Sequence, residues 1–141
     1  MLPTLDDIRR ARACIAGSAI RTPLVRLNEP DVPAEIWLKL ENLQPVGSFK
    51  IRGAANAMAQ LAPAEIARGV LTASAGNMAQ GVAWCARDRG IPCTVIAPDT
   101  APVAKTQAVE RLGACIIKQP FERWWQVFQD RAYPGVDGTF I

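Results

Sequence analysis

From residue 69 onward, short apolar segments alternate with amphipathic stretches, and glycine or proline stands near most of the changes. Short apolar runs bounded by such residues are typical of buried strands, whereas the longer stretches between them have helical periodicity. The pattern predicts strands over 70–73, 93–97 and 114–118, and helices over 77–89, 103–112 and 120–130. This rhythm is typical of right-handed crossovers in a parallel sheet with helices on its faces, so the predicted fold class is α/β.

The first 68 residues have a less regular pattern. Thr4 is a good cap for a helix over 5–16, which Gly17 would end. The other predicted elements are an extended segment at 22–26, a strand at 35–40, a helix at 49–61 and a short helix at 64–68. An apolar stripe on the first helix (Ile8, Ala11, Cys14, Ile15) and an aromatic face on the last (Phe121, Trp124, Trp125, Phe128) are both interpreted as core packing.

Composition adds what the pattern leaves open. Half of the 141 residues are hydrophobic, so one domain of ordinary size or two smaller lobes can form a core. The net charge of +3 comes from cations scattered among the acids without a basic block, which argues against a nucleic-acid surface. No apolar stretch reaches the roughly 20 residues of a membrane span, and the N-terminus lacks a secretory pattern. We therefore expect a cytoplasmic protein.

Residue types also limit the chemistry. Histidine is absent, which removes Ser-His and Cys-His nucleophiles and most transition-metal sites, so no metal site is predicted. The four cysteines, none in a Cys-x-x-Cys pair, are interpreted as buried reduced thiols rather than disulfides (Cys14, Cys85, Cys93, Cys115).

One lysine is placed for chemistry. An apolar segment at 36–40 runs into a turn with Pro45 and Gly47, and Lys50 follows at the start of an alanine-rich helix. A lysine partly shielded from water loses its proton more readily and can form an imine with an aldehyde. The alternative is a solvated lysine at a helix start, which is the commoner role of such residues.

A second turn joins the strand at 70–73 to the next helix. Its sequence is Ser74-Ala75-Gly76-Asn77-Met78. Unpaired backbone N–H groups at such a helix start can converge on an anion such as a carboxylate. The alternative is an ordinary helix cap, in which the side chain of Ser74 or Asn77 satisfies the first turn.

Together the two segments resemble the fold-type-II pyridoxal-phosphate enzymes, and within them the threonine/serine dehydratase and serine racemase branch. The stretch from Lys39-x-Glu41 to Gly47-Ser48-Phe49-Lys50-x-Arg52-Gly53 is similar to the cofactor-lysine motif of that branch. Ser74–Asn77 with Ala79-Gln80-Gly81 is similar to its asparagine loop. The resemblance implies an incomplete tryptophan-synthase-beta-like fold, with 1–68 as the first segment of the large cofactor-binding domain and 69–141 as the small open domain.

The resemblance also implies roles. Lys50 would hold pyridoxal 5'-phosphate through an imine and then act as the catalytic base, while Phe49 would pack near the pyridine ring. Asn77 would hydrogen-bond the phenolic oxygen of the cofactor. The loop residues would bind the substrate carboxylate (Ser74, Ala75, Gly76, Asn77, Met78). Arg52 could neutralise a phosphate or form an ion pair with Glu41 or Asp88. The implied reaction is β-elimination from threonine or serine, which releases a 2-oxoacid and ammonia.

Three positions refine this implication. Ile51 stands where sulfhydrylase and threonine-synthase relatives usually carry aspartate, which favours the dehydratase–racemase group. Ala75 stands where racemases of the family place a serine hydroxyl, and a methyl group cannot transfer protons. Met78 replaces a common histidine, so only backbone contacts are expected there.

Family members continue beyond residue 141 with a glycine-rich phosphate loop, which Gly135 and Gly138 do not form. The chain alone is therefore expected to have little or no lyase activity, and the remainder of the large domain is expected to be absent. A non-catalytic α/β remnant, a small-amino-acid binding module and a serine racemase-like enzyme remain alternatives. A homodimer is one open oligomeric state.

Overall fold

The body of the molecule is built around a four-stranded parallel sheet. The computed structural model describes residues 2–141. The strands lie in the order β5–β4–β3–β6 and comprise β3 (Val70–Ala73), β4 (Cys93–Pro98), β5 (Cys115–Gln119) and β6 (Thr139–Phe140). All three neighbouring pairs are parallel, which confirms the predicted α/β class.

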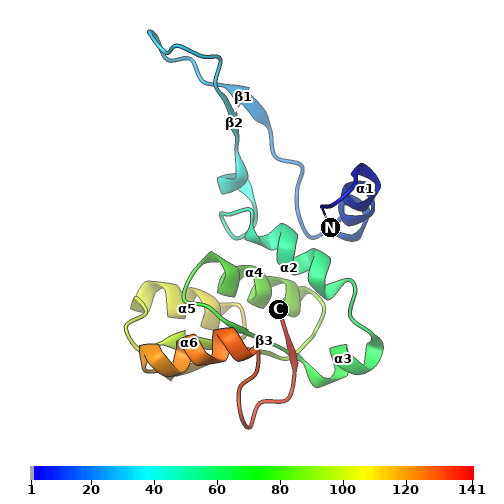
Figure 1. Cartoon of the computed structure of the whole chain (residues 1–141), viewed down its shortest axis with the longest axis vertical. Coiled ribbons are helices and arrows are strands. Elements are labelled where there is room, and N and C mark those ends of the chain that lie inside the picture. The colour runs from blue at the N-terminus through cyan, green and yellow to red at the C-terminus, as the bar shows by residue number, and fades with distance from the viewer. Residues whose placement is uncertain (1) are drawn as a thin grey trace.

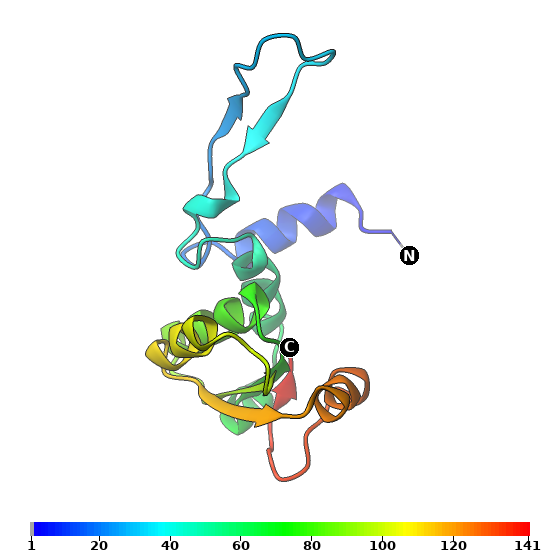
Figure 2. The ribbon, with the colours of Figure 1, turned by 90° about the vertical axis from the view of Figure 1, so that its left-hand side faces the viewer.

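Helices cover both faces of this sheet. Helices α4 (Asn77–Asp88) and α5 (Val103–Arg111) lie on one face, and α6 (Phe121–Asp130) lies on the other (Figure 2). Neighbouring residues of β4 show the division, because Val95 belongs to the larger apolar cluster with α4, and Ile96 belongs to a smaller cluster with Val127 of α6. A strand buried on both faces explains its nearly continuous apolar sequence.

The N-terminal part adds three helices and a hairpin. Its elements are α1 (Leu5–Cys14), β1 (Leu24–Arg26), β2 (Trp37–Lys39), the 3-10 helix η1 (Glu41–Leu43), α2 (Lys50–Met58) and α3 (Pro63–Arg68). Strands β1 and β2 pair antiparallel and project from the body as an arm, while α1 lies apart from the arm beside α2 (Figure 1). Thr4 caps α1 as predicted, with its hydroxyl accepting from the N–H of Asp7 at 3.2 Å.

Helices α2 and α4 pack closely against each other. A methyl group built on Gly81 of α4 would lie 3.2 Å from the backbone nitrogen of Ile51 and 3.2 Å from the carbonyl carbon of Lys50. Small buried residues line the two helices on either side of this point (Ala54, Ala55, Ala79, Ala83). Glycine at position 81 therefore lets the start of α2 lie directly against α4.

Three packing predictions are wrong in part. On α1, Ile8 and Cys14 are exposed and only Ala11 and Ile15 are half-buried. On α6, Trp124 is half-buried, whereas Phe121, Trp125 and Phe128 are 54%, 45% and 47% exposed. All four thiols are free as predicted, but only Cys85 and Cys93 are buried. An apolar stripe shows which side of a helix is apolar, and it does not show whether another element covers that side.

Two features are absent from the described residues. None of the helices in residues 2–141 combines the length and the apolar character that crossing a bilayer requires. The same residues hold no group of three or more His, Cys, Asp or Glu side chains arranged to bind a metal ion.

The contact at Gly81 can be tested by overpacking. Gly81→Val is expected to lower the free energy of unfolding by about 1–3 kcal/mol, because the added side chain meets backbone rather than a movable side chain. The matched control is Gly53→Val on α2, where an added methyl group meets nothing within 4 Å. The control should change the free energy of unfolding by no more than about 0.5 kcal/mol. Equal effects of the two variants in urea unfolding would contradict the close approach.

Candidate active site

Lys50 begins α2 directly after a tight turn. Gly47, with φ of +67°, donates its N–H to the carbonyl of Gln44 at 2.7 Å and closes the turn. The buried hydroxyl of Ser48 then accepts from the N–H of Lys50 at 3.4 Å. The lysine side chain is half-buried, with its ammonium 4.9 Å from the ring centroid of Phe49. Such a contact over an aromatic face is a favourable cation–π interaction.

The loop after β3 is tied by one hydroxyl. Ser74 Oγ accepts from the N–H of Gly76 at 3.2 Å and from the N–H of Ala79 at 3.3 Å. Ser74 thus satisfies one N–H of the first turn of α4, although the N-cap residue of the helix is Gly76 and not Ser74. The N–H groups of Ala75, Asn77 and Met78 donate to no group within residues 2–141. Three free donors at the start of a twelve-residue helix remain for an anion.

Lys50 and this loop share one cavity of about 430 Å³. Of the sequence-predicted residues, Lys50, Ser74 and Met78 line it, and Phe49, Ala75, Gly76 and Asn77 do not. Phe49 is 57% exposed and the side chain of Asn77 is also exposed. The structure thus brings the lysine to the loop, while the individual roles of these side chains stay predictions.

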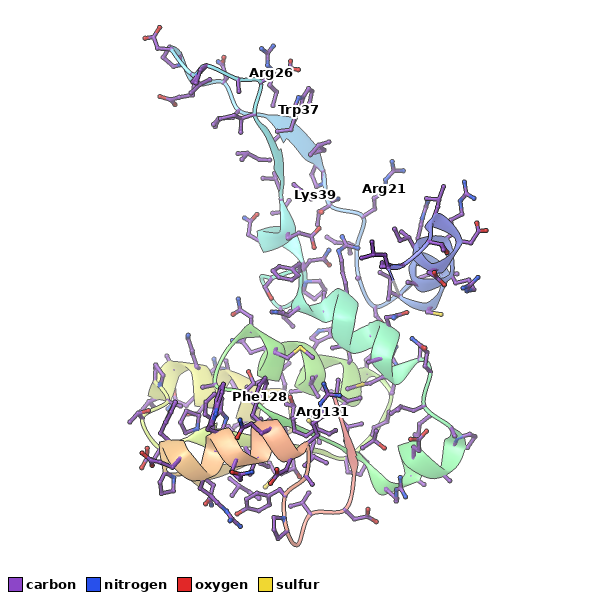
Figure 3. The ribbon with its side chains drawn as sticks, in the orientation of Figure 1. Arg21, Arg26, Trp37, Lys39, Phe128 and Arg131 are labelled. Atoms are coloured by element: carbon purple, nitrogen blue, oxygen red, sulfur yellow. The ribbon has the colours of Figure 1, made fainter. Side chains whose placement is uncertain are left out.

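Sequence reasoning missed the rest of the cavity wall. The further lining residues are Thr72, Ala73, Phe128, Arg131, Phe140 and Ile141. Figure 3 shows Phe128 and Arg131 at the C-terminal end of α6, beside β6. Thr72 and Ala73 end a parallel strand, where ligands gather in this architecture, and that signal could have identified them. Nothing local in the sequence marks Phe128 or Arg131, because their position depends on how α6 packs.

A polar network holds the segment just before Lys50. Arg52 reaches Glu41 with two hydrogen bonds of 2.8 Å each, from Nε to Oε2 and from Nη2 to Oε1. Thr22 Oγ1 donates to Glu41 Oε1 at 2.5 Å, and Gln44 Nε2 donates to Oε2 at 3.2 Å. Of the partners considered for Arg52, the structure selects Glu41, since Asp88 is paired with Arg89.

This network lowers the pKa of Glu41 to about 2. Hydrogen bonding from Arg52 is the largest cause, and the hydroxyl of Thr22 and the charge of Arg52 add to it against the opposing effect of burial. Glu41 is therefore ionised across the physiological pH range and fixes the orientation of Arg52, two residues after Lys50.

These observations define a class of protein: an α/β chain in which one lysine, Lys50, shares a cavity with Ser74 and Met78 of the loop that leads into α4. The family model described as "Pyridoxal-phosphate dependent enzyme" matches residues 15–130. The chain belongs to this family, and the predicted cofactor, pyridoxal phosphate, is the one on which the family depends.

Named relatives support the predicted branch. The L-threonine dehydratase catabolic TdcB of Staphylococcus aureus strain N315 is 44% identical over 117 residues, covering 81% of this chain and 34% of the relative. Serine racemase from maize superposes with a TM-score of 0.89 at 34% identity, covering all of this chain and 44% of that one. A threonine deaminase isoform of Solanum lycopersicum has a TM-score of 0.75 at 29% identity, with 99% and 43% covered. The chain thus spans about a third of the length of the curated relatives it matches.

The Glu41 network predicts how stability depends on pH. The pKa of Glu41 is lower in the folded chain, about 2, than its ordinary value of 4.5. Its contribution is therefore fully present above about pH 4.5 and is lost as the pH falls toward about 2. At pH 7, Glu41→Gln should lower the free energy of unfolding by about 1–3 kcal/mol, and this deficit should shrink as the pH falls through that window.

The matched control for this measurement is Glu35→Gln. Glu35 pairs with Arg26 at 3.4 Å on the exposed hairpin, with its side chain 58% exposed. Exposed pairs contribute about 0–1 kcal/mol, so the control should change stability little at any pH. A Glu41→Gln variant that unfolds like the control in urea at pH 7 would show that the network does not hold the fold.

Proposed function

We propose that this chain carries the cofactor lysine and the substrate-carboxylate loop of a pyridoxal-phosphate-dependent threonine/serine ammonia-lyase. The observation that supports this most directly is the shared cavity of Lys50, Ser74 and Met78. Its volume of about 430 Å³ lies in the range of small-molecule sites. The residues fit the cofactor, because a half-buried primary amine shares its cavity with Met78, whose backbone N–H is one of the free donors of the loop. The domain division at residues 68 and 69 is part of the same proposal.

Each residue has a distinct task. The Lys50 amine would hold the cofactor aldehyde and later remove the α-proton of the substrate. The free N–H groups of Ala75, Asn77 and Met78 would bind the substrate carboxylate, with Ser74 keeping the loop in shape. Asn77, the first residue of α4, would hydrogen-bond the phenolic oxygen of the cofactor. Phe49, directly before α2, would pack near the pyridine ring. Pyridoxal phosphate, when bound, supplies the electron sink on which α-carbon chemistry of amino acids depends.

Two alternatives differ in what they require. A serine racemase-like enzyme needs a proton donor on the opposite face of the cofactor, and the methyl group of Ala75 cannot act as one. A non-catalytic α/β module that binds a small amino acid or a partner needs no reactive lysine at all. The chain spans only part of the length of its relatives, so lyase turnover is proposed for a complete enzyme and not for this chain alone.

The first test asks which lysine reacts with the cofactor. After incubation with pyridoxal phosphate and reduction with borohydride, peptide mapping should find most of the label on Lys50, because a bound aldehyde is held next to this amine. Lys50→Ala should abolish that label. The control Lys118→Ala removes an exposed lysine of β5 and should leave the labelling of Lys50 unchanged. Label spread evenly over the four lysines would favour the non-catalytic module.

The second test separates lyase from racemase chemistry. In a polypeptide that joins this chain to the remainder of a family member, Ala75→Ser should raise the ratio of racemisation to elimination, since it adds a hydroxyl to the carboxylate loop. Chiral chromatography of recovered serine, together with 2-oxoacid release, measures both products in one reaction. A product ratio that stays the same in the variant would contradict the inference that the residue at position 75 decides whether a proton is supplied on the opposite face of the cofactor.

A further inference from the structure

A second cavity, separate from the Lys50 cavity, is lined by four cations. Its volume is about 410 Å³, and it lies among α1, the segment before β1, strand β2 and α2. The cations are Arg12, Arg21, Lys39 and Arg52, and Ile15, Ala16 and Ala19 form an apolar wall. Figure 3 shows Arg21 between the foot of the hairpin and α1, with Lys39 at the foot itself.

The charges of this cavity are not balanced within the described chain. Glu41 is the one carboxylate within ion-pair distance of any of the four cations in residues 2–141, at 2.8 Å from Arg52 and 3.8 Å from Lys39. Arg12 and Arg21 form no ion pair with any described residue, and the Nη1 atom of Arg52 makes no hydrogen bond there. Four positive charges facing one negative charge create a positive potential that attracts an anion.

The backbone that carries Arg21 is held on both sides. The Gln44 amide accepts from the N–H of Ile20 at 3.0 Å and donates to its carbonyl at 2.9 Å. Arg52 Nη2 donates to the same carbonyl at 3.0 Å, and the Lys39 ammonium donates to the carbonyl of Thr22. Because residues 20 and 22 are fixed, Arg21 leaves the backbone at a defined point on the cavity rim. A cation held this way loses less backbone entropy on binding a ligand.

We propose that this cavity binds a small dianion of the phosphate class, with its phosphate group between Arg12, Arg21 and Arg52. Guanidinium groups favour phosphate because two N–H donors in one plane can each form a hydrogen bond to a different phosphate oxygen. The volume exceeds the needs of a bare anion, and the wall of Ile15, Ala16 and Ala19 accommodates the organic part of a phosphate monoester. This proposal does not rest on the reaction proposed for Lys50, since no residue lines both cavities.

The experiment is a titration of the ¹⁵N-labelled chain with inorganic phosphate and, separately, with methyl phosphate at constant ionic strength. Saturable shifts are expected in the amides of residues 12–22, 39 and 52, with the same shifts in the Lys50→Ala variant. Arg21→Ala and Arg12→Ala should each weaken binding about tenfold, which equals about 1.4 kcal/mol. Arg9→Ala, which removes the same charge from α1 outside the cavity, should change the affinity less than about twofold, since exposed charges are screened.

Each result decides the proposal. Tighter binding of methyl phosphate than of phosphate supports the site and assigns the apolar wall to the ester group, and equal affinities support a site for free phosphate. Non-saturable shifts, or an Arg9→Ala effect as large as that of Arg21→Ala, would mean diffuse attraction and overturn the site. Shifts confined to residues 74–79 would place the anion at the carboxylate loop and would also overturn it. Arg12 and Arg21 are tested separately so that a folding defect in one variant leaves the other informative.

Discussion

The contact between the start of α2 and Gly81 of α4 is the constraint on which the candidate active site depends. Lys50 is the first residue of α2, and the loop at residues 74–76 leads into α4, so their separation is set by how closely the two helices approach. A side chain at position 81 would meet the backbone of Lys50 and Ile51 at 3.2 Å. The start of α2 that carries the lysine is therefore positioned by backbone packing. Positioning by rigid elements is what a site requires if its reactive groups are to meet a ligand in one geometry.

Glu41 provides the second constraint, because it ties the segment that leads into Lys50 to the first turn of α2. One carboxylate accepts hydrogen bonds from Thr22 before the hairpin, Gln44 in the turn and Arg52 on α2. All residues of β1 and β2 are exposed, so apolar burial contributes little to holding the hairpin against the body. A network of charged hydrogen bonds takes over that task, because each such bond is stronger than a neutral one and has a defined direction.

The sequence predicted strands β3, β4 and β5 because the signal for each of them was local. Strand β3 was predicted with its observed bounds, since glycine and a polar loop enclose a short apolar run that is buried on both faces. The failures have one cause, which is that coverage by other elements is not a local property. The aromatic face of α6 has the periodicity of a core helix, yet Phe121, Trp125 and Phe128 stack mainly on one another at the surface. Likewise the sequence named two partners for Arg52, and only the fold of the 41–52 segment could choose between them.

The first turn of α2 separates the two cavities. Residues two apart on a helix point about 200° apart around its axis, so Lys50 and Arg52 face different surroundings although they share one turn. Lys50 lines one cavity together with Ser74 and Met78, and Arg52 lines the other together with Arg12 and Arg21. The Glu41–Arg52 pair lies between the two cavities, because it holds the segment that leads into Lys50 and also orients the Arg52 guanidinium, which lines the second cavity. An anion that draws Arg52 away from Glu41 would loosen the segment that positions Lys50, so the geometry of each cavity limits the geometry of the other.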